Sequence, residues 1–397
     1  MHDVPGEPHW HEPMRGQRAG FDTFKRPQMP YDRFMELEDI PVFRGLGVRR
    51  VQDLPMAPWA RLGGRGSYIQ LQGTEGLLGQ YIVEIPASGA LNVERHIYEK
   101  VVLVVEGRGT TEVWQDGQAE PYAFEWQRNS LFAIPLNAVH RFVNASSSPA
   151  LLLCGTTAPN AMNLFDNLEF IFDCQHNFTE RFSGSSDYFV PGEGMEPDPI
   201  RGLAMWRTNF IPDAANCELP LDNRRSPGFR RIEPSMGRNR FYLSIAEHAA
   251  GRYSMAHRSF SAAVLVCLKG KGYSYAWPSS LGATPWKDGH ADKVLRQDYE
   301  PVGLVSTVPG SGEWIHQEFG LGRKNLRLSA WHGANNQRAR RPGRPGETVV
   351  EYGAAEIGAT PAIPYEVEDG HVRSAFEEEL TRNGVLSRMN QGFISSY

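Results

Sequence analysis

The sequence predicts an all-β protein that contains two copies of one small domain, followed by a short helix. Three observations support this expectation: an internal repeat, short apolar runs separated by turn residues, and 40 glycines and 28 prolines among 397 residues. Gly and Pro favour tight turns, and many tight turns imply many short strands. The length leaves room for two or three domains, each with a core of its own.

The repeat can be read directly from the residues. Residues 104–114 (VVEGRGTTEVW) recur as residues 267–277 (CLKGKGYSYAW), and both contain Gly-x-Gly and a later Trp after an apolar run. The matched glycines Gly107 and Gly270 lie 163 positions apart (270 − 107 = 163). Because two copies are too few for a solenoid, we interpret the repeat as duplication of a whole domain.

Each copy contains five short runs of apolar or β-branched residues, separated by Gly, Pro, Asn and Asp. In the first copy the predicted strands are 80–85, 101–105, 110–114, 131–134 and 151–156. In the second copy they are 241–245, 262–268, 273–277, 304–308 and 326–331. Short strands with turn signals between them predict a sandwich or a jelly roll.

Helical periodicity is clear only near the C-terminus. There Val372, Phe376 and Leu380 recur every four residues among charged side chains, which predicts one helix that docks on a barrel. The expected organisation is an N-terminal arm, a first domain, a linker, a second domain and a C-terminal segment with the helix. Their expected bounds are 1–49, 50–180, 181–214, 215–345 and 346–397.

Composition and charge exclude several classes of protein. Hydrophobic residues make up 41% of the chain and charged residues 22%, as in globular domains, and the net charge of −5 gives no basic field for nucleic acid or an anionic membrane. No apolar run reaches the roughly 18 residues of a membrane span, and the N-terminus lacks the apolar core of a signal peptide. The four cysteines show no paired spacing, which favours free thiols. We therefore expect a cytoplasmic protein that binds neither nucleic acid nor membrane.

The motifs of the first copy resemble those of the cupin superfamily. Cupins carry His-x-His followed by a Glu and, eleven residues after the second His, a Gly; a later motif has Pro followed within a few residues by His. Here His96 lies eleven residues before Gly107, and Pro135 precedes His140. The resemblance covers roughly residues 50–335 and implies two tandem cupin barrels, also called double-stranded β-helices or jelly rolls.

The first copy departs from the cupin pattern at two positions. Glu94 stands where the first His is expected, and Lys100 stands at the usual Glu position. Alternate residues of a strand share one face, so Glu94 and His96 point together into the barrel, where His140 can meet them. Two imidazoles and one carboxylate match the facial triad of non-haem Fe(II) enzymes. Glu99 is an alternative carboxylate ligand, and Lys100 could face the metal and clamp a carboxylate substrate.

The second copy keeps fewer of the expected ligands. His257 and His316 are present, and Glu318 lies on the same strand face as His316, but Ser259 replaces the second His. We therefore interpret this site as degenerate, with a structural role. His332, at the end of the last strand, is interpreted as a packing residue. The distance between motifs is longer here by thirteen residues, and an insertion within residues 279–298 explains most of the difference.

The resemblance implies a metal-dependent bicupin, and the expected activity is that of an Fe(II) dioxygenase for a small aromatic or enolic substrate. The alternatives are a Mn(II)- or Zn(II)-dependent decarboxylase, isomerase or lyase, and a binding or structural bicupin without turnover. A homo-oligomer is expected, because cupins commonly pair through barrel edges and N-terminal arms, and residues 20–50 could serve as such an arm.

Overall fold

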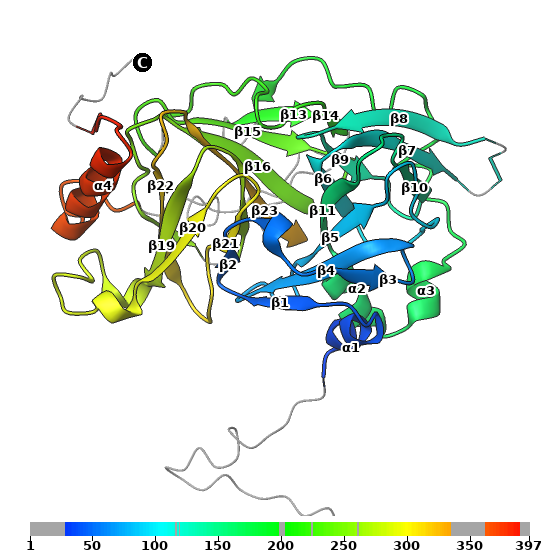
Figure 1. Cartoon of the computed structure of the whole chain (residues 1–397), viewed down its shortest axis with the longest axis horizontal. Helices are drawn as coiled ribbons and strands as arrows, with labels where there is room; N and C mark the ends of the chain where they lie inside the picture. The colour runs from blue at the N-terminus through cyan, green and yellow to red at the C-terminus, as the bar shows by residue number, and fades with distance from the viewer. Residues whose placement is uncertain are drawn as a thin grey trace, which may run out of the picture.

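The computed structural model describes residues 28–115, 117–118, 120–197, 203–223, 225–259, 262–334 and 362–389. Within these residues the chain forms two β-barrels that lie side by side, with the C-terminal helix at the outer end of the second barrel (Figure 1). The predicted all-β class, with two tandem barrels and a short C-terminal helix, is confirmed.

The first barrel, called barrel 1, combines a large sheet of order β1-β4-β5-β11-β6-β9-β14, in which β3 pairs with β4, and a small sheet of order β10-β7-β8. Apart from the parallel pair β1–β4, neighbouring strands are antiparallel. The strands are β1 (Val42–Gly45), β3 (Ala57–Trp59), β4 (Gly64–Leu71), β5 (Gly79–Ile85), β6 (Lys100–Glu106), β7 (Arg108–Trp114), β8 (Tyr122–Gln127), β9 (Leu131–Ile134), β10 (Val139–Val143), β11 (Ala150–Thr156) and β14 (Phe210–Ile211).

The second barrel, called barrel 2, repeats this plan with a large sheet of order β12-β13-β15-β16-β23-β18-β21-β2 and a small sheet of order β17-β22-β19-β20. Its strands are β2 (Gly47–Val48), β12 (Glu196–Pro197), β13 (Ala204–Arg207), β15 (Arg230–Ser235), β16 (Phe241–His248), β17 (His257–Ser259), β18 (Val264–Lys269), β19 (Gly272–Pro278), β20 (Leu295–Tyr299), β21 (Leu304–Ser306), β22 (Trp314–Gly320) and β23 (Leu326–Ala334).

Strand register shows that the two barrels are copies of one pattern. Val101 of β6 pairs with Gly155 of β11 in barrel 1, and Val264 of β18 pairs with Trp331 of β23 in barrel 2. Strands β6 and β18 therefore correspond at an offset of 163 residues (264 − 101), and strands β11 and β23 correspond at an offset of 176 (331 − 155). Val101 also pairs with Ala133 and Val264 with Ser306, an offset of 173 for the latter two. Ten of the thirteen extra residues (173 − 163) therefore lie between β19 and β21, around the predicted insertion.

The central strands of the large sheets are buried on both faces, and alternate residues enter two different cores. From β6, Val102 and Val104 belong to the core inside barrel 1, whereas Val101 and Leu103 belong to a second core. That second core also contains Trp331 of β23 and side chains of β16 and β18, so it lies between the barrels. The two large sheets thus share one apolar layer, and each keeps its other face for the barrel interior.

Short segments also cross between the barrels. Strand β2 pairs with β21 of barrel 2, although it precedes every strand of barrel 1 except β1, and β14 pairs with β9 of barrel 1. The predicted N-terminal arm (1–49) therefore contributes one strand to each barrel, β1 and β2, and the predicted linker (181–214) contributes β12, β13 and β14 to the sheets. The domain bounds drawn from the sequence cut across these pairings.

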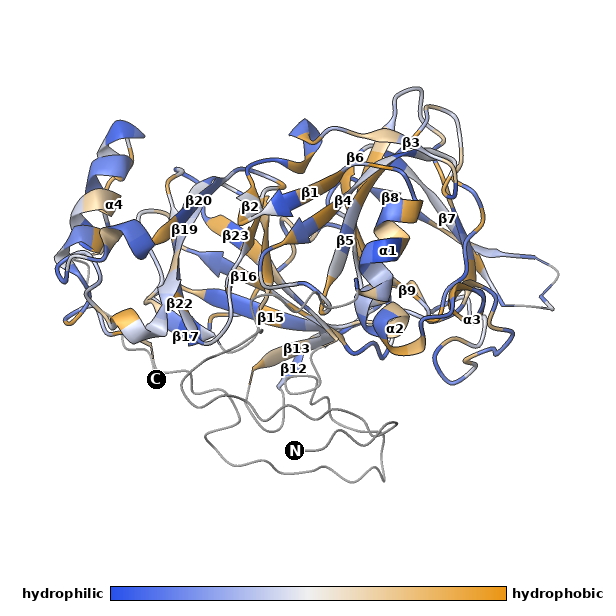
Figure 2. Ribbon diagram, turned by 90° about the horizontal axis from the view of Figure 1, so that it is seen from below, coloured by the Kyte–Doolittle hydropathy of each residue, from blue (hydrophilic) through white to orange (hydrophobic). Residues whose placement is uncertain are grey.

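Helix α4 (Gly370–Arg382) lies at the outer end of barrel 2, as its apolar stripe predicted. Val372, Phe376 and Leu380 are all buried in one cluster with Tyr253 and Phe319 of the barrel. Figure 2 shows the rest of the helix surface as mostly hydrophilic. The helix begins after Asp369, whose carboxylate accepts a hydrogen bond from the His371 backbone N–H, as N-cap residues do.

Three short helices, α1 (Pro30–Leu37), α2 (Ala158–Phe165) and α3 (Leu168–Phe172), pack on barrel 1. One-turn 3₁₀ segments lie at Val51–Asp53, Ser279–Leu281 and Ala291–Lys293. The four cysteines are free thiols, as their spacing predicted. None of the described helices is long and apolar enough to cross a membrane.

Candidate metal centres

The structure brings Glu94, His96 and His140 together in barrel 1, where the sequence predicted a metal centre. Glu94 and His96 lie on the extended segment between β5 and β6, and His140 lies on β10. Two backbone hydrogen bonds of 2.9 Å join Glu94 and His140, which fixes the segment against the strand. One ligand atom from each of the three side chains lies within 4.8 Å of the other two.

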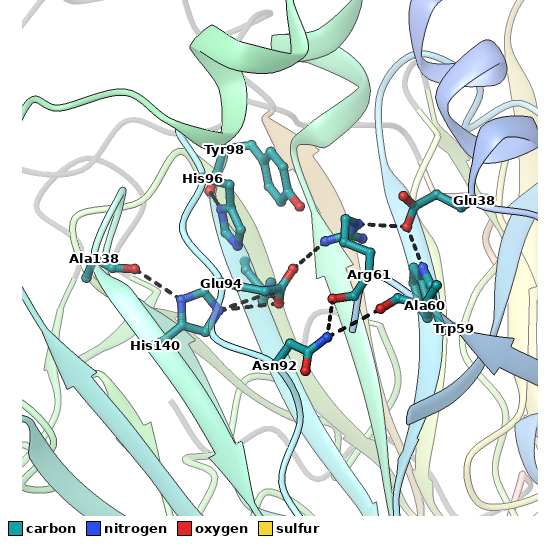
Figure 3. Close-up of polar contacts among 11 residues, drawn as sticks. Glu38, Trp59, Ala60, Arg61, Asn92, Glu94, His96, Tyr98, Ala138 and His140 are labelled. Atoms are coloured by element: carbon teal, nitrogen blue, oxygen red, sulfur yellow. Dashed lines mark hydrogen bonds and ion pairs between the residues drawn. The ribbon is translucent and has the colours of Figure 1, made fainter. Parts of the chain in front are cut away.

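The two imidazoles of barrel 1 are held in a ligand-ready orientation (Figure 3). Nδ1 of His96 donates to the Tyr98 carbonyl at 2.8 Å, and Nδ1 of His140 donates to the Ala138 carbonyl at 3.1 Å. Both Nε2 atoms are therefore left unprotonated in the neutral rings. Burial and the nearby Lys100 ammonium lower the pKa of His96 and of His140, so both rings stay neutral.

Lys100 occupies the middle of this group. Its Nζ lies 2.6 Å from Oε2 of Glu94 and 3.1 Å from Nε2 of His140, and its side chain is 0% exposed. Arg61 binds the other Glu94 oxygen at 2.6 Å. Burial opposes ionisation of Glu94, but Lys100, His140 and Arg61 together hold its pKa well below the usual range.

The donor set of barrel 1 fits a divalent cation only in part. Nε2 of His96 is buried without a hydrogen-bond partner, which is how an uncoordinated ligand looks. However, Glu94 already carries two cationic partners, and the Lys100 ammonium lies against the one ligand nitrogen of His140 that a metal would need. A divalent cation here would face the buried Lys100 ammonium and the partly exposed Arg61 guanidinium, whose charges Glu94 and Glu38 already offset.

Glu99, the alternative carboxylate, does not join this group. Its two oxygens accept hydrogen bonds from the backbone N–H groups of Arg240 and Phe241 at 2.7 and 2.6 Å, and Arg181 approaches at 3.4 Å. The preceding loop therefore turns Glu99 toward barrel 2. Its role is to join the barrels rather than to bind a ligand in barrel 1.

A second group forms in barrel 2, where the sequence predicted a degenerate site. His257 on β17 pairs with His316 on β22, and Glu94 and His140 form the corresponding bridge in barrel 1 (257 − 94 = 163; 316 − 140 = 176). Glu318, two residues after His316, points to the same side, and ligand atoms of the three residues lie within 4.8 Å of one another. This group contains one carboxylate and two imidazoles without a lysine among them.

Glu318 and His316 belong to a continuous hydrogen-bonded chain. Nδ1 of His316 donates to Oε1 of Glu318 at 2.5 Å, and the other Glu318 oxygen accepts from the Ser254 hydroxyl at 2.8 Å. The Ser259 hydroxyl lies 3.1 Å from Nε2 of His316 and donates to it, because Nδ1 already carries the ring proton. A carboxylate on Nδ1 fixes the tautomer that presents Nε2 as a ligand or a base.

The barrel 2 group lines a cavity of about 90 Å³. His257, His316, Glu318 and Ser259 lie in its wall, and the other polar lining residues are Arg225, Arg231, Ser244, His248, Thr307 and His332. Glu318 is the single acidic residue of the lining, and although burial opposes its ionisation, His316, which donates a hydrogen bond to it, lowers its pKa. Burial and the Arg225 guanidinium lower the pKa of His257, so this ring is neutral. The cavity wall therefore combines imidazoles with one carboxylate and two guanidinium groups, of which Arg231 is paired with Glu233.

Sequence reasoning missed several residues of this cavity. His332 was interpreted as a packing residue, but it lines the cavity, and His248, Arg225 and Ser254 received no role. The 163-residue offset could have indicated in part that barrel 2 contains a cavity. It aligns Ser244 and Ala263 of barrel 2 with Tyr81 and Lys100 of barrel 1, and small residues at interior positions leave space.

In each barrel, the segment of the first sequence motif pairs with the strand of the second motif, through Glu94 and His140 in barrel 1 and through His257 and His316 in barrel 2. The candidate ligand side chains of the two motifs lie close together at this pairing. The chain therefore folds as two tandem barrels of one plan. Among solved structures, a mutant of Bacillus subtilis oxalate decarboxylase is 11% identical over 72% of this chain and 76% of that one, with a TM-score of 0.44. Capsicum annuum vicilin is 15% identical, with coverage of 71% and 84% and a TM-score of 0.43.

Lactobacillus farciminis oxalate decarboxylase, solved with formate, is 10% identical over 72% of this chain and 85% of its own chain, with a TM-score of 0.44. No family model matches the chain, and no curated protein matches it.

Proposed function

We propose that this bicupin binds a small carboxylate in barrel 2, beside a divalent cation held by His257, His316 and Glu318. The proposed reaction is redox-neutral: a decarboxylation, isomerisation or elimination assisted by Mn(II) or Zn(II). The observation that carries the proposal is the barrel 2 cavity whose wall contains all three candidate ligands. This assignment reverses the roles that the sequence predicted for the two barrels.

Cavity size argues against the aromatic substrate expected from the sequence. A cavity of about 150 Å³ is known to hold benzene, and this one measures about 90 Å³. A carboxylate of a few carbon atoms fits better than a ring. The polar lining points the same way, because sites for aromatic ligands are lined mainly by apolar side chains. Fe(II) dioxygenase activity on a phenol therefore has no specific support in this cavity.

The residues of the chain divide the work in the proposed site. A divalent cation, when bound, polarises a substrate oxygen as a Lewis acid. His257 and His316 supply nitrogen donors, and Glu318 supplies one negative charge, so the ligand set offsets part of the charge of the cation. Arg225 contributes positive charge that attracts an anionic substrate into the cavity.

The first experiment is metal analysis of protein purified without an affinity tag and loaded with Mn(II) or Zn(II). We expect about one cation per chain in the wild type and none in the His257→Ala/His316→Ala double variant. Calorimetric titration with oxalate, malonate and benzoate then tests the substrate class, and the short dicarboxylates should bind only to loaded protein. Equal metal content in wild type and double variant would contradict the proposal.

One observation favours a second candidate function without metal. Ser259, His316 and Glu318 form a hydroxyl–imidazole–carboxylate chain with the geometry of a serine hydrolase triad. Such a chain could activate Ser259 to attack a small ester. Hydrolysis of p-nitrophenyl acetate that survives chelation and disappears in Ser259→Ala would favour this function. Activity that disappears on chelation and returns with added metal would favour the metal centre.

A further inference from the structure

Barrel 1 contains a buried positive charge that belongs to a side chain of the protein, the ammonium of Lys100. Lys100 begins strand β6, and its ammonium reaches the point where Glu94 and His140 meet. The rings of Tyr81 and Phe142 also flank the ammonium, and their centroids lie 5.9 and 5.7 Å from Nζ. The Lys100 ammonium therefore contacts aromatic rings in addition to the Glu94 carboxylate.

The equivalent positions in barrel 2 carry residues that differ in charge and size. At the offsets fixed by strand register, Lys100 corresponds to Ala263 and Tyr81 to Ser244 (163 each), and Phe142 corresponds to Glu318 (176). Barrel 1 therefore has a cation and two rings where barrel 2 has two small side chains and a carboxylate. Side chains of barrel 1 pack in one buried cluster, and the interior of barrel 2 contains the cavity.

Charge in barrel 1 is already arranged around this lysine. Glu94 accepts from Lys100 through one oxygen and from Arg61 through the other, and Arg61 also binds Glu38 at 2.7 Å. Two carboxylates and two cations thus form one largely buried network with no net charge. A further divalent cation would leave that network with uncompensated positive charge in a medium of low dielectric constant.

We infer that the Lys100 ammonium is the resident cation of barrel 1 and that it closes a latent three-ligand metal site formed by Glu94, His96 and His140. Barrel 1 is therefore metal-free in the wild type, and removal of Lys100 opens its site to a divalent transition metal. The Nε2 atom of His96, buried and without a hydrogen-bond partner, is the ligand atom that remains ready for it. This inference does not depend on what barrel 2 binds.

The experiment isolates barrel 1 by working in the full-length His257→Ala/His316→Ala double variant. This parent, its Lys100→Ala derivative and the Lys100→Ala/His96→Ala derivative are each dialysed against Co(II), and bound cobalt is measured by mass spectrometry and visible absorption. We expect no bound cobalt in the parent, about one per chain in the Lys100→Ala derivative, and none again when His96 is also removed.

A second variant and a wild-type measurement keep the test decisive if Lys100→Ala fails to fold. Lys100→Met retains most of the side-chain volume without the charge, and its folding is checked by near-ultraviolet circular dichroism. Wild-type crystals soaked in Mn(II) should show no anomalous scattering peak beside Nε2 of His96. Such a peak, or a folded lysine variant that binds no cobalt, would overturn the inference.

Discussion

At the scale of single residues, the two barrels carry different side chains at the same pair of facing backbone positions. Glu94 and His140 face each other in barrel 1, and His257 and His316 do so in barrel 2. The decisive neighbour is the residue six positions after the first member of each pair, Lys100 or Ala263, because its side chain either supplies a cation or leaves space. Together with Ser244 in place of Tyr81 and Glu318 in place of Phe142, this difference changes the chemistry of the site.

Glu318→Gln tests the proposed centre at this scale. Loss of the carboxylate removes one anionic ligand and the acceptor that fixes the His316 tautomer, so the affinity of barrel 2 for Zn(II) should fall by at least about tenfold. Competition with a chromogenic chelator measures the change. His290→Ala removes a histidine outside the cavity and should leave the affinity unchanged. An unaltered affinity in Glu318→Gln would mean that this carboxylate neither binds nor orients a metal ligand.

At the scale of elements, the adjacent strands β16 and β23 are joined by a buried ion pair. Arg327 binds Glu247 at 2.8–2.9 Å directly across the strands, and Asn325 donates to the same carboxylate. Burial of Glu247 would raise its pKa, but Asn325 and Arg327 lower it overall. The ion pair therefore links the fold of barrel 2 to pH.

The pH dependence follows from the sign of that shift. Because the folded state lowers the pKa of Glu247, its stabilising contribution is complete above the ordinary value of 4.5 and is lost as pH falls through the folded-state pKa. At pH 7, Glu247→Gln should lower the free energy of unfolding by about 1 to 3 kcal/mol. The difference from wild type should shrink below pH 4.5 in urea denaturation series. A constant difference down to pH 3 would show that the charge has no part in it.

Helix α4 provides the second test at this scale. Phe376 lies in the barrel 2 cluster with ring centroids 4.9 Å from Tyr253 and 5.8 Å from Phe319, so Phe376→Ala leaves a cavity under the helix. We expect a loss of about 3 to 5 kcal/mol in the free energy of unfolding by denaturant. The exposed Glu378→Ala, on the opposite face, should change it by less than about 0.5 kcal/mol. Similar losses for both variants would contradict docking of α4 through its apolar stripe.

At the scale of the whole molecule, the two barrels are joined by a shared core. Alternate residues of the large sheets meet between the barrels, and β2 and β14 cross from one half to the other. Gly155 of β11 marks a close contact, because a Cβ atom there would lie 2.6 Å from the Trp331 ring and 2.9 Å from Phe241. The barrels therefore should unfold together.

Gly155→Ala tests this shared core. The added methyl group must displace the aromatic side chains of barrel 2, so the melting transition should remain single and the free energy of unfolding should fall by about 1 to 3 kcal/mol. Gly370→Ala is the matched control, since no atom lies within 4 Å of a Cβ at that position. Differential scanning calorimetry measures both variants. Two separate transitions in the wild type would show that the barrels are independent.

Much of the fold was predictable from local patterns. The 163-residue repeat, the short apolar runs between turn residues and the stripe of Val372, Phe376 and Leu380 predicted two barrels and a helix, and the structure confirms them. The paired histidines of each barrel were found from motif spacing, and the structure brings them together. Local patterns succeed here because turns, strand alternation and helix faces depend on near neighbours in the chain.

What the sequence by itself determined is therefore the duplicated β-architecture and the residues from which two sites are built. Only the tertiary structure decided which site is open. Whether Lys100 snorkels outward, clamps a substrate or fills its own barrel depends on the side chains that face it from other strands, such as Tyr81 and Phe142. The turn of Glu99 toward barrel 2 and the strand exchange of β2 have the same origin. Contacts between residues distant in sequence set the volume and charge of each interior, and a pattern of near neighbours does not contain them.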